Sequence, residues 1–397
     1  MLIEIILFLL LGIISGTITG LIPGVHINLI GAFIVSLSAS LFYLINPIYL
    51  VVFIVAMAVT HTFVDFIPSI FLGCPDTDTE LSILPGHELL KKGEGYEAII
   101  LTCYGSLAAI FILVLIAYPS ILIISKVYDL LRFFIPYLLI TISLFLIFSE
   151  KKKFPALFVF LLTGFLGLSV LNMAEESEKF LLPLLTGLFG SSMLLISIKN
   201  KFEIPKQKIT KIKTKILKPL LGAVIASPIC SFLPGLGSGQ AAIIGNTISK
   251  SDTKGFLVLL GATNTLVMGF SFISLYVISR TRTGAAAAIQ DILGSLSWQI
   301  LVLVLGVVII SGLVSFFLAG SLAKFFSQRM KKVNYVFLSL ITLLLLVIIV
   351  FLVSGFLGFL ILIASTFTGI YSISLGVRRT NMMGCLLIPT IIFYLTL

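Results

Sequence analysis

The sequence has little charge: only 11% of its 397 residues are Asp, Glu, Lys or Arg, whereas 59% are hydrophobic. A soluble domain of this length could not bury so much apolar surface, so the composition excludes the ordinary soluble classes. Many apolar runs reach about 20 residues, the length that a helix needs to cross a bilayer. The short alternating segments typical of an outer-membrane barrel are lacking. We therefore predict an all-α polytopic membrane protein that lies in the lipid bilayer.

Patterns for metals, disulfides and nucleotides are also scarce. The four cysteines (Cys74, Cys103, Cys230 and Cys385) show no CxxC spacing, and only three histidines are present. No Gly-Lys-Ser/Thr element follows a glycine-rich break, so a phosphate loop is not indicated. The N-terminal run lacks a basic region and carries Glu4, which favours a first membrane segment over a cleaved signal peptide. We expect no catalytic residues and no cofactor, with Na⁺ considered only as a coupling ion.

Apolar runs and helix breakers divide the chain into seven predicted spans on each side of one basic stretch. That stretch, 199–218, contains eight lysines and one glutamate, and the positive-inside rule places it in the cytoplasm. It is either a linker that sets topology or a site for lipid headgroups. The net charge of +10 therefore reflects topology and does not indicate binding to nucleic acid. The predicted spans are 2–22, 26–45, 48–70, 98–125, 133–149, 154–172, 180–198, 219–233, 238–249, 255–279, 294–323, 333–353, 356–376 and 382–397.

Counting crossings from the linker predicts two repeats of opposite orientation. Basic residues at 150–154 lie two spans upstream of the linker and so fall inside, and those at 324–332 fall inside only if the segment 219–249 crosses zero or two times, as a hairpin. Both termini then lie outside the cell membrane. Each half reads as a Pro-Gly hairpin, a span, a re-entrant polar insert and further spans, about five spans in all besides the hairpin. We predict a first transmembrane repeat at 1–198, the cytoplasmic linker at 199–218 and a second repeat at 219–397, an arrangement common in secondary transporters.

Two Pro-Gly pairs interrupt apolar segments at matching places in the two halves. Because lipid cannot satisfy free backbone groups, such breaks must be buried in protein or line a wet cavity. Broken helices offer N–H groups to anions and carbonyls to cations. Kinks that serve packing alone are the alternative. We expect substrate-binding positions at both breaks, at Pro23, Gly24, Asn28, Pro234, Gly235, Gly237, Ser238 and Gly239.

Two polar inserts carry a short alternation of charge and threonine. The first-half insert, 67–98, contains Asp76-Thr77-Asp78-Thr79, and the second-half insert contains Arg280-Thr281-Arg282-Thr283. Guanidinium groups bind carboxylates through paired hydrogen bonds, so Arg280 and Arg282 are candidates for binding an anionic substrate, with Thr77 and Thr79 opposite. The alternative is that these residues are solvated loop charges or partners of one another.

A few polar residues lie inside otherwise apolar spans. His61 and Asp65 are four residues apart on one helix face, and buried ionisable groups in membranes are commonly functional. We expect them to couple transport to an ion, together with Thr265. Asn264 is well suited to bind a ligand or Na⁺. The alternatives are a structural role near a helix end for His61 and Asp65, and helix–helix hydrogen bonding for Asn264 and Thr265.

Three stretches together resemble a known family. The segments GTITGLIPGVHINLIGA, FLGCPDTDTELSILPGHELLKKGEGYEAI and SFLPGLGSGQAAIIGN resemble the TctA-type large permease subunit of tripartite tricarboxylate transporters, in particular archaeal relatives of unassigned substrate. The resemblance spans about 12 to 290. Three departures stand out: the first break reads Pro-Gly-Val-His, Thr263-Asn264 replaces an asparagine pair, and RTRTGAAAA replaces a second-half Pro-Gly hairpin.

The resemblance implies secondary uptake of carboxylates, with a small membrane subunit and an extracytoplasmic binding protein as partners. Together with the inverted repeats, it predicts a transporter of a small organic anion that works by alternating access and is coupled to Na⁺ or H⁺. A homodimer is a further expectation. Two other classes stay open: a membrane-embedded enzyme that acts on a lipid-linked substrate, with His61, Asp65, His87 and Glu88 as its candidate cluster, and a passive channel.

Overall fold

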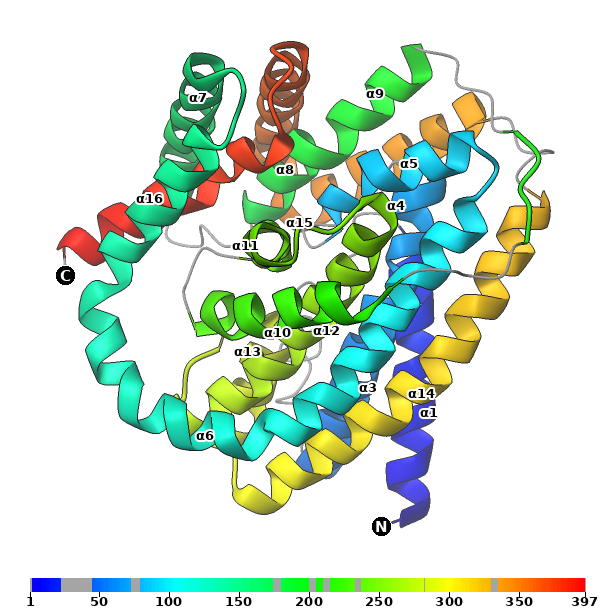
Figure 1. Cartoon of the computed structure of the whole chain (residues 1–397), viewed down its shortest axis with the longest axis vertical. Helices are drawn as coiled ribbons and strands as arrows, with labels where there is room; N and C mark the ends of the chain where they lie inside the picture. The colour runs from blue at the N-terminus through cyan, green and yellow to red at the C-terminus, as the bar shows by residue number, and fades with distance from the viewer. Residues whose placement is uncertain are drawn as a thin grey trace.

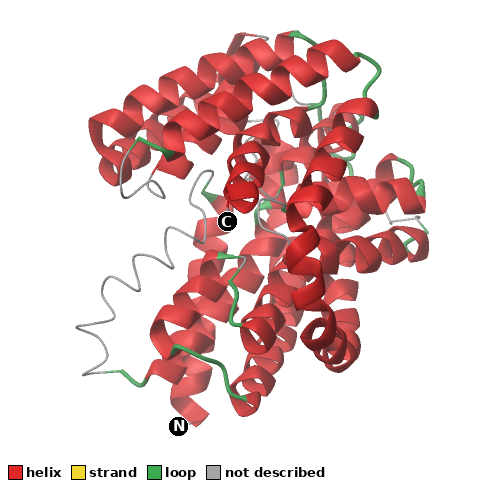
Figure 2. Ribbon diagram, turned by 90° about the vertical axis from the view of Figure 1, so that its left-hand side faces the viewer, coloured by secondary structure: helices red, strands yellow, loops and turns green. Residues whose placement is uncertain are grey.

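The computed structural model describes residues 2–22, 45–72, 79–173, 180–199, 205–209, 215–232, 237–281, 283–329 and 335–396. Figure 2 shows helices and connecting loops, with no strand among these described residues. This confirms the all-α class expected from the composition. Several predicted site residues lie outside the described residues, namely Pro23, Gly24, Asn28, Thr77, Pro234, Gly235 and Arg282.

The helices follow the predicted spans closely. In the first half they are α1 (Leu2–Leu21), α3 (Pro47–Val64), α4 (Phe66–Leu72), η1 (Glu80–Ser82), α5 (Ile83–Lys91), α6 (Gly95–Phe148), α7 (Lys153–Leu171), α8 (Leu181–Leu185), the π-helical turn η3 (Thr186–Ser191) and α9 (Ser192–Lys199). In the second half they are α10 (Leu217–Phe232), α11 (Ser238–Ser249), α12 (Thr253–Ile278), α13 (Gly284–Leu293), α14 (Trp298–Arg329), α15 (Tyr335–Ser374), η5 (Arg379–Met383) and α16 (Gly384–Thr396).

Two helical segments form the centre of the molecule. Within the described residues, seven helices are long and apolar enough to cross a membrane. In the segment Pro47–Leu72 and in α12, 94% of the most apolar window is buried inside the protein, compared with 22 to 39% in the other five. The exposed apolar faces of those five helices therefore suit lipid contact, whereas α3, α4 and α12 are shielded from it. Polar side chains on these central helices are therefore kept away from lipid.

Two predicted spans of the first half are joined into one helix, whereas the corresponding break in the second half is present. The predicted spans 98–125 and 133–149 belong to one helix, α6, which contains Pro119 and Pro136 and curves through a wide arc (Figure 1). The charged residues between the two spans are compatible with a helix, so the chain needs no loop there. In the second half, α15 is interrupted at Gly355, where φ is 62° and ψ is −159°. This break falls between the predicted spans 333–353 and 356–376.

Glycines allow α6 and α12 to approach backbone to backbone. A Cβ atom on Gly105 would overlap the carbonyl oxygen of Val258, and one on Gly261 would overlap that of Thr102. The hydroxyl of Ser106 uses this proximity to donate to the Gly261 carbonyl over 3.0 Å. Small residues at such crossings are typical of membrane helices, which associate through close packing and hydrogen bonds.

Charged and polar contacts tie together the segments that the charge pattern predicts on the cytoplasmic side. Lys254, at the start of α12, donates to Glu97 near the start of α6 over 2.7 Å. Gln207 from the linker accepts a hydrogen bond from Gly95 N over 2.8 Å. Arg378 and Glu150, which the crossing count also assigns to this side, form an ion pair of 2.5 Å. Residues assigned to one face by counting crossings therefore lie together in the fold.

Candidate functional site

The buried helix α3 carries a row of polar side chains, each bonded to a different neighbouring helix. The hydroxyl of Thr60 accepts from Ser315 of α14 over 2.9 Å. His61 Nδ1 lies 3.0 Å from the hydroxyl of Thr19 on α1. The hydroxyl groups of Thr62 and Thr265 of α12 are 3.3 Å apart. Together these pairs join α3 to three other helices at one level of the bundle.

The end of this row brings two predicted site residues together. Asn264 Nδ2, on α12, donates to the carboxylate Oδ2 of Asp65 over 3.0 Å. Both side chains are buried, with relative exposures of 3% and 4%. A hydrogen bond to an ionised carboxylate is stronger than one between neutral groups and offsets part of the cost of burying the charge. These contacts place five polar side chains of α3, α12 and the turn between α3 and α4 close together. We call this group the central cluster; it consists of His61, Thr62, Asp65, Asn264 and Thr265.

The local sequence explains why the helix breaks at Asp65. Asp65 is a turn residue between α3 and α4, and its N–H still donates to His61 O over 2.9 Å. Pro68 follows three residues later and has no N–H with which to continue the ladder of backbone hydrogen bonds. Asp65 keeps helical angles, with φ −60° and ψ −22°, so the interruption is local and the carboxylate lies in the protein interior at a weakened turn of the helix. Interruptions of this kind are where transporters commonly bind solutes and coupling ions.

Thr79 of the first polar insert is connected to this break. Its hydroxyl lies 2.5 Å from the hydroxyl of Ser69, which also donates to Asp65 O over 2.8 Å. Ser82 in turn donates to Thr79 O over 2.6 Å, at the start of α5. The predicted position Thr79 is thus two hydrogen bonds from the central cluster, and the insert packs against α4 as α5.

The remaining described candidates lie at other places. Gly237 precedes α11, and Ser238 and Gly239 form its buried first turn, next to α10 and α12. Arg280 is exposed just beyond the end of α12. At 1.5 Å per helical residue, the end of α12 lies about 20 Å from Asn264. The structure therefore does not bring Arg280 to the central cluster.

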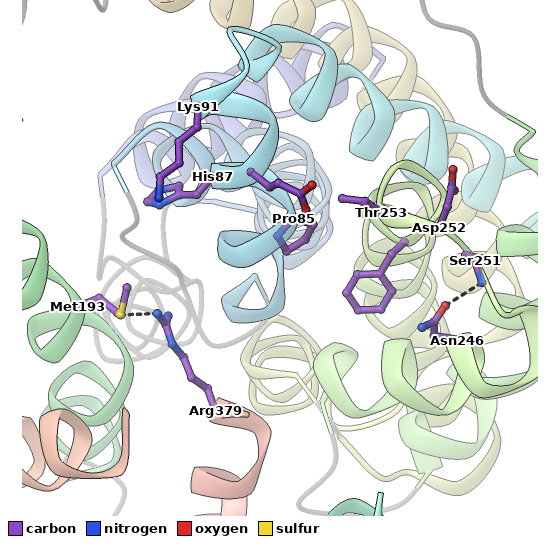
Figure 3. Close-up of a pocket in the computed structure, with 11 residues that line it drawn as sticks. Pro85, His87, Lys91, Met193, Asn246, Ser251, Asp252, Thr253 and Arg379 are labelled. Atoms are coloured by element: carbon purple, nitrogen blue, oxygen red, sulfur yellow. Dashed lines mark hydrogen bonds between the residues drawn. The ribbon is translucent and has the colours of Figure 1, made fainter. Parts of the chain in front are cut away.

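A cavity that the sequence analysis did not identify lies between α5, α9, η5 and the connection from α11 to α12. It has a volume of about 600 Å³. Three basic side chains line it: His87 and Lys91 from α5 and Arg379 from η5 (Figure 3). Burial, together with the charges of Arg379 and Lys91, lowers the pKa of His87 to about 4. The i,i+4 spacing of His87 and Lys91 is a signal that could have revealed this face. We call this space the basic cavity.

The residues described by the structure show no metal-binding group. No three of their His, Cys, Asp or Glu side chains are close enough together to hold a metal ion. The three described cysteines (Cys103, Cys230 and Cys385) are buried. The central cluster instead offers one carboxylate, an amide and hydroxyl groups, a set of oxygen ligands suited to a hard cation or to a proton.

The fold and the central cluster together are those of a polytopic helical membrane protein with a buried polar site between the two halves of its chain. The family model of the tripartite tricarboxylate transporter TctA family matches residues 6–384. The chain belongs to this family. An uncharacterized protein of Methanocaldococcus jannaschii is 33% identical over 404 aligned positions, which cover 98% of this chain and 99% of the relative. No solved structure matches the chain.

Membership gives the coarse function. The family consists of the large membrane subunits of tripartite transporters, which work with further subunits and a binding protein. The chain is therefore a multi-pass membrane protein of a transporter family. The match also confirms the resemblance expected from the three sequence stretches, and the relative in Methanocaldococcus jannaschii agrees with the expected likeness to archaeal proteins of unassigned substrate.

Proposed function

We propose that the chain is a secondary active transporter of a small organic anion, a di- or tricarboxylate, in the cell membrane. It works by alternating access and couples uptake to Na⁺ or H⁺. The observation that carries this proposal is the buried pair Asp65 and Asn264, which joins the two halves of the chain at a helix break. An ionisable group at such depth is costly, and in membrane proteins it commonly marks an ion or solute pathway.

Asp65 is the group we assign to coupling. A bound Na⁺ or proton neutralises its carboxylate and lowers the cost of enclosing it, so that the occupied site can close. The hydroxyl groups of Thr62 and Thr265, close to one another, supply further oxygen ligands if the ion is Na⁺. A hydrogen bond with Thr19 of α1 holds the His61 side chain in place, one helical turn before Asp65.

The packing of the helices supports inverted repeats at 1–198 and 219–397. In the first half α1 packs on α3, and α10 packs on α12 in the second. The central helices then exchange partners: α3 packs on α14, and α12 packs on α6. The later spans follow the same scheme, with α7 on α16 and α9 on α15. This reciprocal pattern is what two repeats related by a pseudo-two-fold axis require.

The proposed orientation places the linker 199–218 and the basic loops in the cytoplasm and both termini outside. The family suggests a small membrane subunit and an extracytoplasmic binding protein as partners, and a homodimer is compatible with the exposed apolar helices. On this orientation the binding protein delivers the anion on the side opposite the linker. Substrate contacts at Gly237, Ser238 and Gly239 come from the N-terminal turn of α11, whose N–H groups favour an anion.

A ligand panel on the purified chain tests the proposal without the other subunits. Succinate, malate, citrate and inorganic phosphate are each added with and without Na⁺, at pH 6 and pH 8, and the midpoint of thermal unfolding is measured. We expect at least one carboxylate to raise the midpoint, and one cation to strengthen that shift. The Asp65→Asn variant should lose the dependence on the cation. If none of these carboxylates stabilises the chain under any condition, the anion proposal fails.

A further inference from the structure

The basic cavity lies apart from the central cluster, and its walls come from elements far apart in the sequence. His87 and Lys91 come from α5, Met193 comes from α9, Asn246 from the end of α11, and Arg379 from η5. In Figure 3 the Lys91 and His87 side chains lie side by side, and Arg379 reaches toward the same side of the cavity next to Met193. First-half and second-half elements therefore meet around one polar space.

The size of the cavity suits a small molecule. Its volume of about 600 Å³ is within the range of 300 to 1,000 Å³ that is common for small-ligand sites. The lining is mixed, with basic side chains on one side and Asn246, Ser251 and Asp252 on the other (Figure 3). Pro85, Met193 and Phe256 add apolar surface, so the lining suits a ligand with charged ends and a carbon skeleton between them.

Two cations and two carboxylates line the cavity, and the cations Lys91 and Arg379 lie together on the side away from Asp252 (Figure 3). Glu88 lines the cavity but is paired with Lys92 over 2.7 Å, on the same helix. The second acidic residue, Asp252, accepts a hydrogen bond from Gly255 N over 2.9 Å as the N-cap of α12. Glu88 therefore has a cationic partner outside the lining, whereas Asp252 keeps its negative charge at the start of α12. The positive charges of Lys91 and Arg379 act on the cavity strongly enough to contribute to the low pKa of His87.

The neutral lining adds directional donors. Asn246 Oδ1 accepts a hydrogen bond from Ser251 N over 3.1 Å. The Nδ2 amide group of Asn246 can therefore donate to a ligand. Arg379 presents a planar fork that matches a carboxylate, and Lys91 presents a point charge from a different element. Two cationic groups on separate elements suit an anion with charge at both ends.

We propose that the basic cavity is a second binding site for the transported carboxylate, in which Arg379 and Lys91 bind the two ends of a di- or tricarboxylate. This inference rests on the proposed function. On the proposed orientation all of its walls lie on the cytoplasmic side, so the cavity holds the anion after it leaves the central cluster and before it enters the cytoplasm. The ligand chemistry, an organic carboxylate with at least two charges, distinguishes the site from a general anion site.

Charge-removing variants test the assignment by direct binding. Equilibrium binding of radiolabelled succinate and citrate to the purified chain is measured for Lys91→Gln and Arg379→Gln. Lys218→Gln serves as the matched control, because Lys218 is exposed, is predicted on the same face and does not line the cavity. One charge-assisted hydrogen bond is worth enough to change affinity about tenfold. We expect two binding events in the parent chain, and loss of one of them, or at least about a tenfold weakening, in either variant but not in the control.

A labelling experiment locates the second event. Ser251→Cys, in a Cys74→Ser background, places a thiol in the wall of the cavity, and its rate of modification by a negatively charged methanethiosulfonate is measured. We expect succinate or citrate to slow this modification at least threefold, and the protection to disappear when Lys91→Gln is added. Equal protection by inorganic phosphate contradicts the carboxylate assignment.

The outcomes separate the two proposals. If no carboxylate binds at all, the proposed function fails and the cavity site fails with it. If a carboxylate binds in an Asp65-dependent manner while both Lys91→Gln and Arg379→Gln bind as the parent does and Ser251→Cys is not protected, only the cavity site is overturned. Lys91 is exposed, so its variant keeps the test valid even if Arg379→Gln does not fold.

Discussion

The amide of Asn264 and the carboxylate of Asp65 are joined by a hydrogen bond of 3.0 Å, although 199 residues separate them in the chain. The bond connects the central helix of one half to that of the other. It lies at the only turn between α3 and α4, where the backbone ladder is interrupted. Any movement of one half relative to the other has to keep this contact or break it.

Removal of the Asp65 charge should abolish coupling while the fold persists. We expect Asp65→Asn to reduce gradient-driven uptake into proteoliposomes more than tenfold, because the cation loses its carboxylate. The exposed carboxylate Asp291 provides the control, and Asp291→Asn should transport at the parent rate. Uptake that stays gradient-dependent in Asp65→Asn would show that the coupling ion binds elsewhere.

The partner side of this bond should be tested separately. Asn264→Ala removes the donor and leaves the buried carboxylate with one hydrogen bond fewer, which typically costs about 1.5 to 3 kcal/mol. We expect a lower midpoint of thermal unfolding, and a smaller further loss when Asn264→Ala is combined with Asp65→Asn. Additive losses in this double-mutant cycle would mean that the two side chains do not act on one another.

The glycine contact between α6 and α12 should be intolerant of a single methyl group. Gly261→Ala drives its Cβ into the Thr102 carbonyl, and overpacking of this kind costs about 1 to 3 kcal/mol. We expect a fall of several degrees in the unfolding midpoint. Gly306→Ala is the matched control, since a Cβ there meets nothing within 4 Å and alanine is the better helix former. Equal midpoints for the two variants would contradict the tight crossing.

The orientation can be checked with a pair of exposed positions. Met173 lies just beyond the end of α7, on the side predicted to face outward, and Lys153 begins the same helix on the predicted cytoplasmic side. In a Cys74→Ser background, a membrane-impermeant maleimide applied to intact cells should label Met173→Cys and leave Lys153→Cys unlabelled until the cells are opened. The reverse pattern means that the whole topology is inverted.

Acid should destabilise the chain through His87. Its folded-state pKa of about 4 lies below the ordinary value of 6.5, so the unfolded chain binds the proton more readily. The stability that His87 contributes is complete above pH 6.5 and is lost as the pH falls from 6.5 toward 4. Arg379, Lys91, Glu88 and Asp252 are the charged groups that face this space. We expect His87→Gln to flatten the fall of the unfolding midpoint across this range, which thermal scans at half-unit intervals can measure.

Much of the helical arrangement could be predicted from hydropathy and breakers, because a bilayer demands apolar spans of fixed length. The break at Gly355 was predicted, whereas the continuity of α6 was not, since charged residues between two apolar runs suit a loop as well as a helix. Asp65 and Asn264 were each singled out for their polarity within a span. Their pairing could not be predicted, because it depends on how the two halves pack. His87 and Arg379 were missed as a site for the same reason: η5 lies far from α5 in the sequence.

The continuity of α6 has a mechanical consequence. Its first part packs in the hydrophobic core that surrounds α3 and α12, and its last part, with Leu139 and Leu146, packs in a second core with α7 and α16. The continuous, curved helix α6 thus connects the two hydrophobic cores. If the first part of α6 tilts, either the second core moves with it or the helix bends at Pro119 and Pro136. The stiffness of this one helix therefore sets how much motion near Asp65 reaches the far side of the protein.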